Sequence, residues 1–282
     1  MRFDRPGILL ATVLFLVGAA APVTAQTQWT AGVGLWTDVG NWSAGVPSST
    51  FDADIAKGGT AQVTTPGQEC SAATLGGSST LLVDGAGLLE CLQVYVSNNS
   101  GASTLTISNG GEFRVNQFFG GLTGPPDVGQ VTVTGTGSLL AATSSAQLGG
   151  GLPGGQITVD LSNGGEFSSA GFTLAGAGST ATINVGTGGV AGVLAGNVSL
   201  GGSPGTGTVN FNHTNAISFA FDISGGIVVS KSGTGTLTLT GTNTYTGGTT
   251  VSGGTLSGTT TSLQDDIVNN ATIEFDQAAG GT

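Results

Sequence analysis

An apolar pattern that returns at a fixed interval along the chain is the strongest constraint on how this chain folds. Two rows keep a 26-residue step through five repeats: Leu105, Val131, Ile157, Ile183 and Val209, and, two positions on, Ile107, Val133, Val159, Val185 and Phe211. A third row keeps it with Val96, Leu122, Leu148, Leu174 and Leu200. A fixed period of roughly 20–50 residues is typical of a chain that stacks copies of one small unit.

Each repeat has the pattern of short strands joined by glycine-rich turns. Val131-Thr132-Val133-Thr134 alternates with a period of two, which predicts valines pointing inward and threonines pointing outward. The outward row is Thr106, Thr132, Thr158, Asn184 and Asn210. Three strand-and-turn segments fit within one period, so we expect an all-β parallel β-helix, or β-solenoid, of about 26 residues per turn.

Composition agrees with this fold class. The chain has 53 glycines among 282 residues, only 7% charged residues and 38% hydrophobic residues. A disordered segment combines low hydrophobicity with high charge, and collagen has glycine at every third position, so both classes are excluded.

The N-terminus has the pattern of a secretory signal peptide. Arg2 and Arg5 precede an apolar run from Ile8 to Ala21, and Val23-Thr24-Ala25 resembles a cleavage site. We expect cleavage after Ala25. This removes two arginines and one aspartate, which leaves 3 basic and 15 acidic residues. A nucleic-acid partner is therefore excluded, because such a partner needs basic groups.

The chain has two cysteines, Cys70 and Cys91, whose separation is close to one period of the repeat. In an exported protein they could sit on neighbouring turns and form one disulfide, and two buried thiols are the alternative.

All three tryptophans, Trp29, Trp36 and Trp42, lie in the first part of the predicted mature chain. We interpret them as an aromatic cap that closes the N-terminal end of the stack, as terminal repeats require. A sugar-binding aromatic platform is the alternative.

A glycine- and threonine-rich motif follows the rows of 26-residue period. Its residues are Lys231, Gly233, Gly235, Leu237, Leu239, Gly241, Asn243, Tyr245, Thr246, Gly247, Gly248, Thr249 and Val251. This segment resembles the passenger-associated transport repeat, also called the autotransporter-associated β-strand repeat. The resemblance implies a right-handed β-helix in a passenger of a Gram-negative autotransporter, exported through the inner membrane to the cell surface, the outer membrane or the medium. The repeat would assist export and folding.

The resemblance also implies partners. A C-terminal outer-membrane barrel would be one, and a surface ligand, either a glycan or a protein of a host or neighbouring cell, would be another. The chain departs from the family because no barrel follows and only one complete repeat is present. We therefore expect these divisions: signal peptide 1–25, Trp-rich cap 26–66, solenoid turns 67–226, transport repeat 227–258 and a truncated further turn or repeat 259–282.

No catalytic, cofactor or metal site is expected. His213, the one histidine, lacks a nucleophile motif around it, and zinc ligands with supporting spacing are absent. Glu112 and Glu166 fall in different turns, and Asp52 and Asp54 read as a polar strand edge rather than a cation site. Our main hypothesis is that the chain is a non-enzymatic surface scaffold or adhesin, and the alternative is a carbohydrate-active β-helix enzyme. A threonine-based ice-binding surface is disfavoured because the outward row mixes Thr with Asn.

Overall fold

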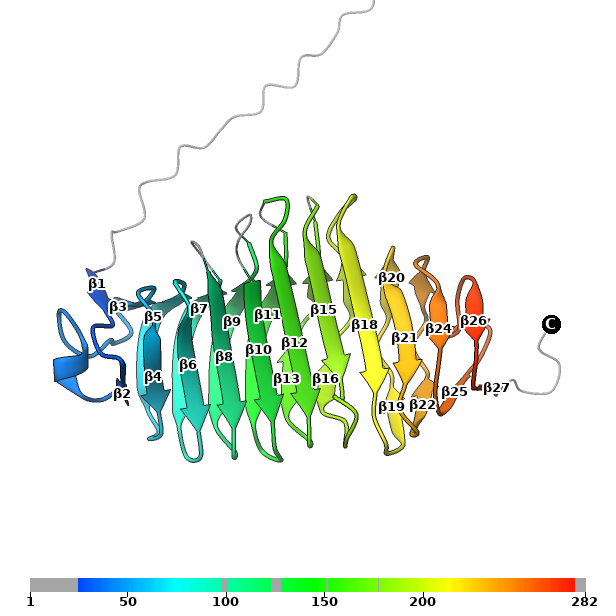
Figure 1. Ribbon diagram of the computed structural model, residues 1–282, viewed down its shortest axis with the longest axis horizontal. Coiled ribbons are helices and arrows are strands. Elements are labelled where there is room, and N and C mark those ends of the chain that lie inside the picture. The colour runs from blue at the N-terminus through cyan, green and yellow to red at the C-terminus, as the bar shows by residue number, and fades with distance from the viewer. Residues whose placement is uncertain (1–24, 98–100, 123–127, 151, 177, 277–282) are drawn as a thin grey trace, which may run out of the picture.

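The chain forms an all-β parallel β-solenoid of about nine turns, which confirms the predicted fold class. The structure is a computed structural model that describes residues 25–97, 101–122, 128–150, 152–176 and 178–276. The predicted signal peptide lies outside these residues except for Ala25. In Figure 1 the strands of the near sheet point downward while the chain advances from left to right, so the coil is right-handed.

Two parallel sheets run along the described solenoid, and a third sheet of four strands lies along its C-terminal part. Successive turns of the coil add strands to these sheets. The first sheet contains β1 (Ala25–Gln28), β3 (Phe51–Ile55), β5 (Gln68–Leu75), β7 (Leu88–Val96), β9 (Glu112–Gly120), β11 (Leu139–Leu148), β13 (Glu166–Ser169), β14 (Phe172–Leu174), β16 (Val193–Ala195), β17 (Val198–Leu200), β20 (Ile223–Gly225) and β23 (Thr244–Tyr245).

The second sheet contains β2 (Val33–Leu35), β4 (Gly59–Val63), β6 (Ser79–Asp84), β8 (Ala102–Ser108), β10 (Val128–Thr134), β12 (Gln156–Ser162), β15 (Thr180–Val185), β18 (Thr206–Asn212), β21 (Val228–Ser232), β24 (Thr249–Val251) and β26 (Ile267–Asn269). The third sheet contains β19 (Ile217–Phe219), β22 (Thr236–Leu239), β25 (Thr255–Gly258) and β27 (Thr272–Phe275). Within the described residues the one helical segment is a 3₁₀ turn, η1 (Val39–Asn41), and no helix there could span a membrane.

The length of a turn changes along the solenoid, with a spacing of about 24 residues. In the second sheet one column of paired residues is Ala61, Leu81, Leu105, Val131, Val159, Ile183, Val209, Val229, Thr249 and Ile267. The turns lengthen from the Ala61–Leu81 pair to the Val131–Val159 pair. They then shorten again toward the Thr249–Ile267 pair at the C-terminal end.

Two consecutive turns depart from the constant 26-residue step that the sequence rows predicted. Val131 pairs with Val159 rather than with Ile157, and Val159 pairs with Ile183. A turn of 28 residues is thus followed by one of 24 residues, and the two together span two ordinary steps. Because inward positions repeat every two residues, a shift of two keeps the same side chains inside. The sequence pattern alone could not reveal this shift.

The third predicted row also changes at one position. Gly120, rather than Leu122, pairs with Val96 on one side and Leu148 on the other. A Cβ atom on Gly120 would collide with the Cδ1 atom of Ile157. The side chain of Ile157 therefore fills the space that a leucine at position 120 would occupy.

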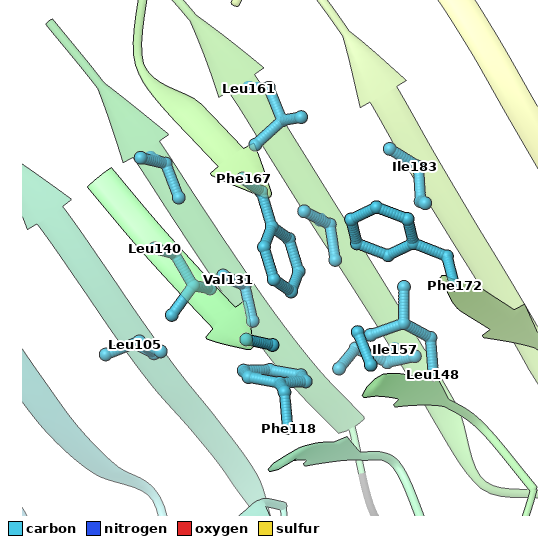
Figure 2. Close-up of a cluster of buried hydrophobic side chains, with 14 of the residues drawn as sticks. Leu105, Phe118, Val131, Leu140, Leu148, Ile157, Leu161, Phe167, Phe172 and Ile183 are labelled. Atoms are coloured by element: carbon cyan, nitrogen blue, oxygen red, sulfur yellow. The ribbon is translucent and has the colours of Figure 1, made fainter. Parts of the chain in front are cut away.

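The interior between the sheets is apolar and contains aromatic rings from successive turns. Phe118 lies edge-to-face with Phe167 at a centroid distance of 5.3 Å, and Phe167 with Phe172 at 4.8 Å. All three rings are buried. Figure 2 shows them converging with Leu105, Val131, Ile183 and other aliphatic side chains of the facing strands. Burial of this apolar surface is the main stabilising term in these turns.

Amide and carboxylate side chains form a ladder on the outer face of the second sheet. Gln130 donates to Asp160 at 2.7 Å, Asn184 donates to Asp160 at 2.7 Å, and Asn210 donates to Asn184 at 2.9 Å. Asp160 takes the place that the sequence row gave to Thr158, because of the same two-residue shift.

Candidate functional site

The transport-repeat motif builds short turns near the C-terminal end of the described solenoid. Its apolar members Leu237, Leu239 and Val251 are fully buried, and they lie on β22 and β24. Strands are short here: β23 has two residues and β24 has three. Fewer strand residues leave fewer backbone bonds between turns, so other contacts must hold these turns together.

Lys231 occupies an inward position of β21 that is apolar in neighbouring turns. It pairs with Phe211 in the preceding turn and Val251 in the next, and its side chain is fully buried. Its Nζ donates to the carbonyl oxygens of Ser232 (2.7 Å), Gly233 (3.2 Å) and Gly253 (3.1 Å). The ammonium group has three donors, so all three are satisfied. Burial lowers the pKa of Lys231.

Asn243 connects three successive turns through its side-chain amide. Its Oδ1 accepts from the backbone N–H of Ile223 at 2.8 Å, and its Nδ2 donates to the carbonyl of Ser262 at 2.6 Å. The side chain is buried, with 3% exposure. Asn243 thus satisfies a buried donor of the preceding turn and an acceptor of the following turn.

Tyr245 and Thr249 form a second buried polar contact. The two hydroxyls lie 2.8 Å apart, and the Tyr245 hydroxyl accepts from the backbone N–H of Gln264 at 3.2 Å. The Thr246 side chain is exposed, but its backbone N–H donates to the carbonyl of Gly225 at 2.8 Å. These contacts again join the repeat to the turns before and after it.

The glycines of the motif allow close packing of one turn on another. A Cβ atom at Gly235, Gly241 or Gly247 would collide with a backbone carbonyl oxygen of the preceding turn. Gly233 and Gly248 have φ angles of 72° and 79°, which L-residues with a side chain rarely adopt. Sequence reasoning identified these glycines through resemblance, and the structure shows close approach of turns at Gly235, Gly241 and Gly247 and a positive φ at Gly233 and Gly248.

The structure joins Cys70 and Cys91 in a disulfide. They are paired residues on the neighbouring strands β5 and β7, with Cα atoms 4.7 Å apart. Their separation of 21 residues matches the length of the turn at this point of the first sheet. Both side chains lie at a shallow hollow that Glu69, Glu90 and Leu92 also line.

The three tryptophans form one buried cluster at the N-terminal end of the solenoid. Trp42 lies edge-to-face with Trp29 and with Trp36, at centroid distances of 5.0 and 4.9 Å. The Trp42 Nε1 donates to the carbonyl of Trp36 at 2.7 Å. Because the rings are at most 5% exposed, they do not present the open ring face that a sugar platform needs.

The candidate acids do not converge. Glu112 and Glu166 each pair with Leu139, so they lie two turns apart with a leucine between them. Glu112 forms an ion pair of 2.6 Å with Arg114. Asp52 and Asp54 lie on β3, and Asp54 accepts from Gln28 at 3.2 Å. Across the described residues no group of three or more His, Cys, Asp or Glu could hold a metal ion.

Sequence reasoning missed two features of the site. It gave Lys231 and Asn243 no physical role, because their partners include carbonyl groups in loops, and the sequence does not reveal where those loops run. It gave His213 no catalytic role, but it did not predict that this ring is fully buried beside the repeat.

Comparison with known families supports the motif assignment. Residues 229–257 match the family model of the passenger-associated-transport-repeat. No curated protein and no solved structure matches the chain. The matched residues contain the buried lysine, the bridging asparagine and the close-packed glycines described above. The segment is therefore a passenger-associated-transport-repeat, and it forms consecutive turns of the β-solenoid.

Proposed function

We propose that this chain is the passenger part of an autotransporter-type protein, displayed at the cell surface as a non-enzymatic scaffold or adhesin. The observation that carries the proposal is the transport repeat at residues 229–257, set within a β-solenoid. Repeat and fold together fit an autotransporter passenger. The proposal includes export by the signal peptide 1–25 and a C-terminal outer-membrane barrel as the translocation partner.

We propose that the N-terminal segment 26–66 is the first part of the solenoid stack and carries the cap. Strands β1 to β4 already pair within the first and second sheets, and the tryptophan cluster packs at this end of the solenoid. We propose that this cluster caps the apolar interior. A solenoid contacts only neighbouring turns, so turns can be added one after another as the chain leaves a membrane pore.

One outer surface suits a neutral ligand such as a glycan. Asn184, Asn210 and Asn212 line a hollow of about 420 Å³ together with Ser230 and Ser232. These amides and hydroxyls offer both donors and acceptors but no charge, which matches the hydroxyl groups of a neutral sugar. We propose that this hollow binds the ligand of the adhesin, and binding to a glycan array tests this.

Export is tested in Gram-negative cells that produce the full-length gene product with an epitope tag in the solenoid. Protease added to intact cells should degrade the tag, and deletion of residues 1–25 should protect it. The Asn243→Ala variant should reduce surface display more than Asn210→Ala, whose side chain lies on the outer ladder. A tag that stays protected in the unmodified protein would refute the passenger proposal.

The enzyme alternative has a direct test. Purified protein is incubated with neutral and acidic polysaccharides, and reducing ends and unsaturated products are measured. We expect no turnover. Turnover that persists through purification and disappears in Glu112→Ala or Glu166→Ala would instead establish a carbohydrate-active enzyme.

A further inference from the structure

His213 is a fully buried imidazole with one unsatisfied nitrogen. It directly follows β18, and its ring has no exposed surface. The Nδ1 atom lies 2.8 Å from the carbonyl oxygen of Asn215, so it is the nitrogen that carries the proton in the neutral ring. The Nε2 atom is buried and has no hydrogen-bond partner in the described structure.

A buried positive charge acts on the imidazole of His213 from the next turn. This charge is that of Lys231, which is also fully buried. Uncharged groups that approach His213 include the Asn215 carbonyl and the glycines Gly186, Gly233 and Gly235. Burial is the main cause that lowers the pKa of His213; the Asn215 carbonyl raises it by a smaller effect, and the charge of Lys231 adds a further, smaller lowering effect.

His213 and Lys231 lie where the turns of the solenoid become shorter and the third sheet begins. The turn from Val209 to Val229 is shorter than the turn from Ile183 to Val209 before it. The third sheet begins at β19, and β16, which lies one turn earlier, pairs with β13 but not with β19. An apolar hollow of about 250 Å³ opens here beside Phe219. We call the contact of residues 211–217 with residues 231–235 the joint.

We propose that the joint is an acid-sensitive connection between the longer turns before it and the transport repeat. Protonation of His213 would place a second cation beside Lys231 and add a buried N–H without an acceptor. Both effects cost free energy in the closed joint and are relieved when the joint opens. The inference goes beyond the proposed function, since it concerns the folded protein whatever its location.

The direction of the pH effect follows from linkage. The ordinary pKa of histidine is 6.5, and the closed joint holds that of His213 lower. The open state therefore binds the proton more tightly. The contribution to stability is complete above pH 6.5 and is lost as the pH falls from 6.5 toward the pKa of the closed joint. Over that range the open population rises roughly tenfold per pH unit.

Nuclear magnetic resonance can measure the titration directly, because His213 is the one histidine of the chain. The protein is prepared without a histidine tag, and the imidazole proton signals are followed from pH 8 to 4. We expect a midpoint below 6.5, or local unfolding before the ring titrates. A midpoint at or above 6.5 in the folded protein would overturn the proposal.

Amide hydrogen exchange tests whether protonation opens the joint. The reporter amides are Gly235, which donates to the His213 carbonyl at 2.9 Å, and Thr214, which donates to Gly189 at 2.9 Å. Exchange is measured at pH 7.5 and 5.5 and normalised to β10 amides of the same molecule, which corrects for chemical exchange. We expect the reporters to lose about tenfold more protection than β10 at the lower pH.

The His213→Asn variant keeps a donor near the Asn215 carbonyl but cannot titrate, so it should lose this extra pH response. Equal changes in the reporters and β10 of the wild-type protein would overturn the proposal. The wild-type measurements decide the question even if the variant does not fold.

Discussion

The turns built from residues 101–211 and the transport repeat at 229–257 stack in the same coil but hold together by different means. In the first region strands of six to ten residues predominate in the second sheet and in β9 and β11, and aromatic rings fill the interior. In the repeat, strands have two to five residues, and buried polar side chains join one turn to the next.

The difference shows two ways of stacking turns of unequal length. Longer strands share many backbone hydrogen bonds, so the interior needs only apolar side chains of suitable volume. Shorter strands leave some backbone groups without a partner in the sheet, and side chains such as those of Lys231 and Asn243 form hydrogen bonds with such groups. The first kind of turn should tolerate apolar exchange, whereas the second depends on particular functional groups.

The largest effect is expected in the aromatic interior. Phe167→Ala removes a ring that contacts Phe118 and Phe172, and the resulting cavity should cost about 3–5 kcal/mol. Phe167→Leu should cost clearly less, because it keeps most of the volume. Urea unfolding followed by circular dichroism measures both. Equal losses in the two variants would contradict packing as the main stabilising term.

The disulfide should have the next largest effect. Replacing Cys70 and Cys91 by serine removes a cross-link over 21 residues, which an entropic model values at about 3 kcal/mol. Mass spectrometry with a thiol-reactive label should show no free thiol in the exported protein before reduction. Labelling of both cysteines without reductant would show that the cross-link does not form.

A smaller but more selective effect is expected for the bridging amide. Asn243→Ala leaves the Ile223 N–H and the Ser262 carbonyl without partners and should cost about 2–3 kcal/mol. Asn210→Ala, on the outer ladder, should cost about 0.5 kcal/mol or less, because water replaces its contact. If both substitutions had the same cost, the proposed dependence of the repeat on buried polar groups would be wrong.

Much of the fold could be predicted from the sequence, and the failures have physical causes. The alternation around Val131 and the repeated apolar rows predicted a parallel solenoid. The pairing of Val131 with Val159 could not be predicted, because a shift of two residues preserves the inward face. The pairing of Leu148 with Gly120 instead of Leu122 could not be predicted either, because it depends on how the side chain of Ile157 fills the interior.

The sequence predicted which residues form the transport-repeat motif, but it did not predict which groups their side chains contact. The motif residues were visible through their resemblance to a family, yet the carbonyl groups around Lys231 come from loops whose paths the sequence does not reveal. The burial of His213 likewise depends on the close approach of Gly233 and Gly235 from the next turn.

Buried side chains of the motif hold the repeat to the turns before and after it by hydrogen bonds. Hydrogen exchange of the Ile223 amide tests this most directly. This N–H donates to Asn243 Oδ1, and its exchange can be compared in the wild-type protein and in Asn243→Ala at pH 7.5. We predict that Ile223 loses about fivefold or more in protection while β10 amides keep theirs, since a net hydrogen bond contributes about 1 kcal/mol or more. Unchanged protection at Ile223 would contradict the account.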